Sequence, residues 1–138
     1  MIGTLVVDTS VVFGALDRFD PNHDACAATV SFGATVVMPA PILVEVDWLA
    51  RSRGRRGAVA TLLAGVLDGS TLVANLDETD YARVADLVER YDDLPLSLAD
   101  ASVIAIAERL EQDTIATLDR RHFSVVRPLH IDAFTLVP

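Results

Sequence analysis

The sequence predicts an α/β fold of three layers, in which a short, mostly parallel central sheet is flanked by helices. Two observations lead to this prediction. Short apolar segments alternate with helical ones, and the short segments are apolar on successive residues rather than on every second residue. Strands with this composition are buried on both faces, because helices cover each face of a parallel sheet. Such a layering is an α/β/α sandwich, and residues 1–138 are expected to form one domain.

Apolar runs that end at turn residues or charges predict the strands. TLVV stops at Asp8, and TIATL stops at Asp119. The expected strands are residues 4–7, 34–38, 71–76 and 114–118, followed by extended segments at residues 124–126 and 134–137.

First-turn prolines and terminal glycines mark several helix ends, as Pro41 and Gly54 do for one helix. The segment after residue 96 has little polar surface in its middle, so it is expected to be buried. Trp48 could pack at an interface, but burial in the core is the preferred interpretation. The expected helices are residues 10–17, a segment that begins near Pro21, and residues 40–53, 55–67, 79–91 and 97–110, with Tyr81, Val84, Leu87 and Val88 on one apolar face.

The charge balance argues against a protein that binds nucleic acid through a broad basic surface. Net charge is −9, with 20 acidic residues against 11 basic ones, all of them arginine. Such a surface repels phosphate, but it is compatible with an enzyme that meets nucleic acid through bound metal ions. The run RSRGRR, Arg51 to Arg56, is the one basic cluster in the sequence. It could hold phosphates or an acidic partner, but a helix end also favours arginine, and we prefer this structural interpretation.

Cysteine content and hydropathy indicate where the protein resides. A single cysteine, Cys26, excludes an intramolecular disulfide, fits a reducing compartment and is expected in the core. Asp8 interrupts the apolar N-terminus, so a signal peptide is not expected. The longest apolar run, residues 35–44, contains two prolines and is too short to span a bilayer. We therefore expect a soluble, cytoplasmic protein without a membrane partner.

Most of the acids have ordinary explanations as helix-start or solvated residues, but four attract attention. Asp8 and Asp119 each follow an apolar strand, and Asp100 opens a helix with Ser97 at capping-box spacing. Glu45 lies in an apolar helix, where the nearby Asp47 is a rival. Each acid alone could be a cap or a surface residue.

Taken together, the four acids predict a metal site. Sites in parallel sheets form beyond the carboxyl ends of the strands, which is where Asp8 and Asp119 fall. A cluster of carboxylates is stable at neutral pH only with cations or raised pKa values. An all-oxygen site suits Mg²⁺ or Mn²⁺, and such ions can activate water against a phosphodiester.

Four segments resemble, in order and spacing, the PIN-domain ribonucleases and especially the VapC toxins of bacterial toxin–antitoxin pairs. They are VVDTSVVFGAL, PAPILVEVDWLAR, LPLSLADASVIAIAERL and IATLDRRHFSVVRP. The resemblance implies that the family's acids correspond to Asp8, Glu45, Asp100 and Asp119, as catalytic residues and metal ligands. Thr9 and Ser10 match a position that often supports the metal or its water.

The resemblance also implies an activity and partners. PIN-domain toxins use Mg²⁺, with Mn²⁺ as a possible substitute, to cut structured or single-stranded RNA such as tRNA or rRNA. They commonly form homodimers, are inhibited by a cognate antitoxin of the VapB type, and can form larger toxin–antitoxin assemblies. These properties are expectations for this chain.

Other classes fit less well. A dehalogenase-type phosphatase needs a second aspartate where this chain has Ser10, and a receiver domain needs a late lysine, which this chain lacks. A non-enzymatic alternative is an interaction module whose acidic pocket binds an arginine-bearing peptide. Metal-dependent RNA cleavage distinguishes the enzyme from the module.

Overall fold

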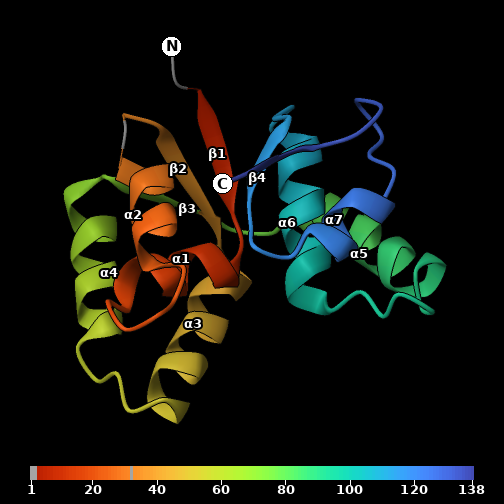
Figure 1. Cartoon of the computed structure of the whole chain (residues 1–138). Coiled ribbons are helices and arrows are strands. Elements are labelled where there is room, and N and C mark those ends of the chain that lie inside the picture. Colours follow the sequence, from red (N-terminus) through yellow and green to blue (C-terminus); the bar gives the residue numbers. More distant parts are fainter. Residues whose placement is uncertain (1–2, 32) are drawn as a thin grey trace.

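The structure is a computed structural model, which describes residues 3–31 and 33–138. Its centre is a five-stranded sheet of order β3-β2-β1-β4-β5, in which every neighbouring pair is parallel (Figure 1). The predicted parallel sheet is confirmed. The strands are β1 (Thr4–Val7), β2 (Thr35–Pro39), β3 (Thr71–Ala74), β4 (Thr114–Ala116) and β5 (Thr135–Val137).

The strand order creates a crevice at the carboxyl ends of β1 and β4. From the central β1 the chain winds outward to β2 and β3, and then returns to the other side of β1 for β4 and β5. Val6 and Val7 of β1 pair with Ile115 and Ala116 of β4. At such a reversal of strand order the crossover helices diverge to opposite faces and leave a crevice between them. The residues that follow β1 and β4 therefore face this crevice.

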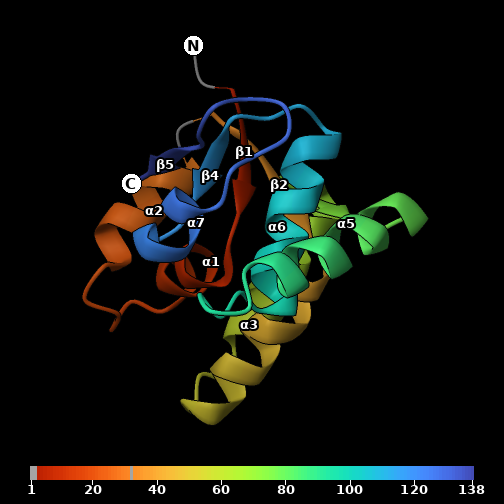
Figure 2. The same ribbon diagram turned by 90° about the vertical axis from the view of Figure 1, so that its right-hand side faces the viewer.

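Helices cover both faces of the sheet. Figure 1 shows α1, α2 and α4 on one side of the strands and α5, α6 and α7 on the other; in Figure 2 this second layer faces the viewer. Both views show α3 extending beyond the carboxyl ends of the strands. The helices are α1 (Thr9–Leu16), α2 (His23–Ser31), α3 (Ala40–Ser52), α4 (Ala58–Asp68), α5 (Glu78–Arg90), α6 (Leu98–Arg109) and α7 (Arg120–Val125).

The core lies between the sheet and these helices. Val103, Ile104 and Ile106 of α6 are fully buried, which confirms the prediction for this helix. Cys26 is also fully buried, as predicted. In the part of the chain that the structure describes, no helix combines the length and the apolar composition needed to cross a bilayer.

One prediction for an apolar side chain was wrong. Trp48 is 69% exposed, because α3 buries the face that carries Ile42, Val46 and Ala50, and Trp48 lies off this face. On the predicted apolar face of α5, Val84 and Leu87 are buried, whereas Tyr81 and Val88 are exposed.

The extended segment expected at residues 124–126 is largely helical instead, because α7 runs to Val125. The Asp119 side chain accepts a hydrogen bond from the His122 N–H and so starts this helix. The sequence of residues 124–126 alone did not reveal the cap.

Three acids expected at helix starts or on solvated surfaces are ion-paired. Asp80 is buried on α5 and pairs with Arg109 at 2.9 Å. Asp17 pairs with Arg55, and Glu108 pairs with Arg83. Burial of these carboxylates is tolerated because each has an arginine partner from another element.

Candidate active site

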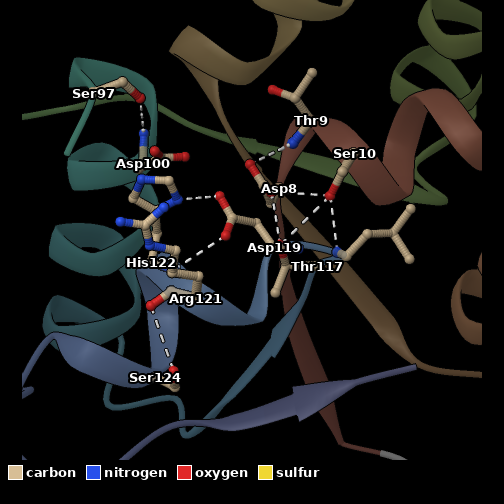
Figure 3. Close-up of polar contacts among 11 residues, drawn as sticks. Asp8, Thr9, Ser10, Ser97, Asp100, Thr117, Asp119, Arg121, His122 and Ser124 are labelled. Carbon is tan, nitrogen blue, oxygen red and sulfur yellow. Dashed lines mark hydrogen bonds and ion pairs between the residues drawn. The ribbon is translucent and has the colours of Figure 1, made fainter. Parts of the chain in front are cut away.

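Asp8 ends β1 and is the N-cap of α1, with a side chain only 4% exposed (Figure 3). Its Oδ1 accepts a hydrogen bond from the Thr9 N–H at 2.7 Å. Its Oδ2 accepts hydrogen bonds from the hydroxyls of Ser10 at 3.0 Å and Thr117 at 2.8 Å. The capping role and a site role are thus compatible, since the cap holds the carboxylate rigidly at the crevice.

Burial raises the pKa of Asp8 from its ordinary value of 3.8 to about 6. The neighbouring charge of Asp100 raises this pKa further, whereas the hydrogen bonds from Thr117, Thr9 and Ser10 lower it. The raised pKa means that the groups around Asp8 do not compensate for the burial of its negative charge.

Asp119 follows the end of β4 and begins α7. Its Oδ1 accepts a hydrogen bond from the His122 N–H at 3.1 Å, and its Oδ2 contacts Nδ1 of the same histidine (Figure 3). The Asp119 N–H donates to the Thr117 hydroxyl at 2.9 Å. Thr117 therefore bonds to both Asp8 and Asp119 and fixes the distance between the ends of β1 and β4.

Asp100 lies in the first turn of α6, on the opposite side of the crevice. Its N–H donates to the Ser97 hydroxyl at 3.1 Å, so Ser97 caps the helix as the sequence predicted. Burial raises the pKa of Asp100, and Asp119 raises it too, whereas Ser97 and His122 act in the opposite direction. One potential ligand atom each from Asp100, Asp119 and His122 lies within 4.8 Å of the others.

Glu45 reaches the site from α3 through a hydroxyl. The Thr9 hydroxyl donates a hydrogen bond to Glu45 Oε1 at 2.5 Å. The rival Asp47 instead pairs with Arg51, one turn further along the helix, at 2.9 Å. The structure thus connects Glu45 with Asp8 through Thr9, and both acids lie outside the tight group of ligand atoms that Asp100, Asp119 and His122 form. We refer to Asp8, Glu45, Asp100 and Asp119 as the acidic cluster.

Sequence reasoning missed Thr117 and assigned no metal-site role to His122. Thr117 is buried directly after β4, two residues before Asp119, and a hydroxyl at this strand end is the signal that could have identified it. His122 lies three residues after Asp119 in the sequence. Its position on the first turn of α7 brings its ring to the carboxylates.

The charges of the acidic cluster fit a divalent cation. Among residues 3–31 and 33–138, no arginine forms an ion pair with any of the four acids, and the histidine at Asp119 is their only basic contact. Carboxylate oxygens suit Mg²⁺ or Mn²⁺, and an imidazole ligand would favour the transition metal. The arrangement can hold a cation where the strand ends, α6 and α7 meet.

A family model described as PIN domain matches residues 5–128, so the chain belongs to the PIN-domain family. Within this family its sequence is 32% identical to Ribonuclease VapC26 of Mycobacterium tuberculosis. This similarity extends over 135 residues, which are 97% of this chain and 100% of the relative.

Solved structures share the fold at low sequence identity. VapC20 of M. tuberculosis, described as a sarcin-ricin loop cleaving toxin, superposes with a TM-score of 0.79, at 17% identity, over 94% of this chain and 99% of that one. A toxin–antitoxin complex from Klebsiella pneumoniae gives a TM-score of 0.64 at 16% identity, over 89% and 92%. FitAcB from Neisseria gonorrhoeae gives 0.60 at 20% identity, over 87% and 91%.

Proposed function

We propose that this protein is a metal-dependent endoribonuclease and the toxin of a type II toxin–antitoxin pair, acting in the cytoplasm. The observation that carries the proposal is the convergence of carboxylates without arginine partners at the carboxyl ends of β1 and β4, in a PIN-domain chain related to a VapC ribonuclease. A cluster of this kind has the donor set for Mg²⁺, or for Mn²⁺ as a substitute.

In this proposal Asp8, Asp100 and Asp119 hold the cation, and His122 is an additional ligand or orients Asp119. When bound, the cation would promote ionisation of a water and stabilise the oxygens of the phosphodiester. Glu45 would orient this water and receive its proton. Thr9 holds Glu45 by its hydroxyl, and Ser10 supports the carboxylate of Asp8.

Ser10 also fixes the start of the segment that carries Asp119, because its hydroxyl accepts the Leu118 N–H at 2.9 Å. This bond and the two bonds of Thr117 join the ends of β1 and β4. They prevent the acids from moving apart under mutual repulsion. Because the carboxylates of such a preorganised cluster are already in place, little free energy is spent on rearranging them when the cation binds.

The proposed partners are an RNA substrate of the tRNA or rRNA class, a VapB-type antitoxin and a second copy of the chain. Relatives named as a ribonuclease and as part of a toxin–antitoxin complex support the first two. A homodimer is supported by large apolar side chains exposed on α3, Val44 at 70% and Trp48 at 69%. Such residues are typical of protein interfaces.

The test is RNA cleavage by purified, antitoxin-free protein with Mg²⁺ or Mn²⁺, and again with EDTA. Total tRNA and ribosomal RNA are suitable substrates. We expect cleavage only with the metal, and a fall in activity of more than about 100-fold for Asp8→Asn and for Asp100→Asn, because a ligand contributes at least as much as the residues that support it. The matched control is Glu89→Gln, which removes an exposed acid from α5 and should keep parental activity.

Calorimetric titration with Mn²⁺ separates the alternatives. Cation binding without cleavage of any RNA would contradict the nuclease and favour the alternative, a non-catalytic module whose acidic pocket binds an arginine-bearing peptide. Absence of both binding and cleavage would show that the acidic cluster is not a metal site. Cleavage that persists in EDTA would contradict the proposed metal dependence.

A further inference from the structure

Positive charge is concentrated at one end of this acidic protein, apart from the acidic cluster. Five of the 11 basic residues lie where α3 leads into α4 and where α1 leads towards α2. We call these side chains the arginine patch: Arg18, Arg51, Arg53, Arg55 and Arg56.

Two members of the arginine patch stabilise the fold. The Arg55 Nε donates to Asp17 Oδ1 at 3.0 Å, and the side chain of Asp17 is only 5% exposed. Arg53 lies over the ring of Phe13, 5.2 Å from its centroid. For these two arginines the structural interpretation of the RSRGRR run holds, because both join the α3–α4 turn to α1.

The other members project into solvent. The Arg51 side chain is 79% exposed, and its acidic partner is Asp47 on the same helix. Arg56 is exposed and has no acidic partner within the described part of the chain. Arg18 lies 4.8 Å from the centroid of Phe19, a ring that is itself 65% exposed.

These side chains border two adjoining surface hollows. Arg51 and Asp47 line the first, Arg18 and Asp17 line the second, and Arg55 and Arg56 line both. The lining thus holds four arginines against two acids, and both acids are already paired. The hollows present an excess of positive charge on a chain whose net charge is −9.

Two helices connect the arginine patch to the acidic cluster. Thr9 begins α1 beside Asp8, and Phe13, one turn later, lies under Arg53. On α3, eight residues separate Glu45 from Arg53, which is roughly 12 Å at 1.5 Å per residue. An RNA strand with one phosphate at the acidic cluster would need to extend only over this distance to place another phosphate at the arginine patch.

We propose that the arginine patch binds backbone phosphates of the RNA strand that flanks the cleaved bond. This inference rests on the proposed nuclease function. Guanidinium groups pair well with phosphate oxygens, and the exposed Phe19 offers a ring on which a base can stack. An acidic nuclease needs such a local site, because its overall charge repels the substrate.

The test compares two double variants that remove equal charge. Arg51→Ala/Arg56→Ala removes the two exposed patch residues, and Arg90→Ala/Arg127→Ala removes two exposed arginines elsewhere. Binding of a labelled single-stranded RNA is measured by fluorescence anisotropy in EDTA over a range of salt concentrations, so that cleavage does not interfere. Arg55 is left intact because Asp17 depends on it.

We expect the patch variant to bind RNA more weakly, with a plot of log affinity against log salt that is less steep by about 1.4, since each phosphate contact with a single strand contributes about 0.7. The control variant should keep the parental slope. Unfolding temperature and Mn²⁺ affinity should be unchanged in both variants, which shows that fold and acidic cluster are intact.

Equal losses in the two variants would mean that only net charge matters, and would overturn the proposal. A patch variant that keeps the parental salt slope would also overturn the proposal. This includes the case in which the patch variant loses affinity for the antitoxin and not for RNA. A parent that binds RNA through the patch but never cuts RNA would overturn the nuclease function and leave the phosphate site standing.

Discussion

Asp8 destabilises the metal-free protein in its ionised form. Its carboxyl group is buried beside Asp100, and its pKa of about 6 lies well above the ordinary 3.8. A group with a raised acid pKa binds its proton more tightly in the folded than in the unfolded state, so stability falls as pH rises through the interval between the two values. At pH 7 the destabilisation reaches about 3 kcal/mol, using 1.36 kcal/mol per pKa unit.

The direction of this pH dependence gives a prediction for the stability of Asp8→Asn. In EDTA the variant should be more stable than the parent at pH 7, and the excess should shrink by about 1 kcal/mol or more on going down to pH 5, where Asp8 of the folded parent is mostly protonated. Urea denaturation at the two pH values measures this. Added Mn²⁺ should reverse the order, because only the parent binds it. If the parent were more stable than the variant at pH 7 in EDTA, the ionised Asp8 carboxylate would not destabilise the folded state as described.

Helices α1 and α2 pack in close contact, and a glycine permits this. A Cβ atom added at Gly14 of α1 would lie 2.7 Å from Cys26 Sγ, closer than real Cβ contacts, and 3.2 Å from Cys26 Cβ, which is tighter than most. Since Asp8 is the N-cap of α1, a shift of this helix would also move the acidic cluster. The packing of two elements thus determines the position of a site residue.

Gly14→Ala should lower the free energy of unfolding by about 1–3 kcal/mol through overpacking, less the roughly 1 kcal/mol that alanine gains in a helix. Adding Cys26→Ala removes the obstructing sulfur and should restore part of the loss. Denaturation of the parent, both single variants and the double variant gives the coupling energy. Strictly additive effects would show that the two residues do not contact each other as described.

At the scale of the whole molecule, the exposed apolar face of α3 bears on the proposed homodimer. Val44 and Trp48 are one helical turn apart and both exposed, on a helix that also carries Glu45. If this face is the interface, α3 would be held by the core on its buried face and by the second copy on its exposed face. Dimerisation would then support Glu45 at the acidic cluster.

Trp48→Ser should therefore weaken self-association by about 30-fold or more, since a buried interface tryptophan commonly contributes at least 2 kcal/mol. Sedimentation velocity over a range of concentrations measures this. The matched control is Leu67→Ser on α4, where the leucine is 88% exposed. A parent that sediments as a monomer at all concentrations, or equal effects of the two substitutions, would refute an interface at Trp48.

Local sequence was sufficient for most of the framework. Continuous apolar runs identified the three inner strands β1, β2 and β4, because strands covered on both faces have this composition. Prolines and glycines marked the ends of α3 closely. Asp8 and Asp119 could be assigned to one sheet edge because parallel strands all end at the same side.

Only the tertiary structure decided which distant groups meet. Thr117 donates a hydrogen bond to Asp8, which is 109 positions away in the sequence. Thr9 donates one to Glu45, 36 positions away, and not to the neighbouring Asp47. The same holds for buried Asp80, whose partner Arg109 lies on the next helix. A local pattern reports the preference of a residue for strand, helix or water. Whether a polar group is buried, and with which partner, depends on contacts that exist only after the chain has folded.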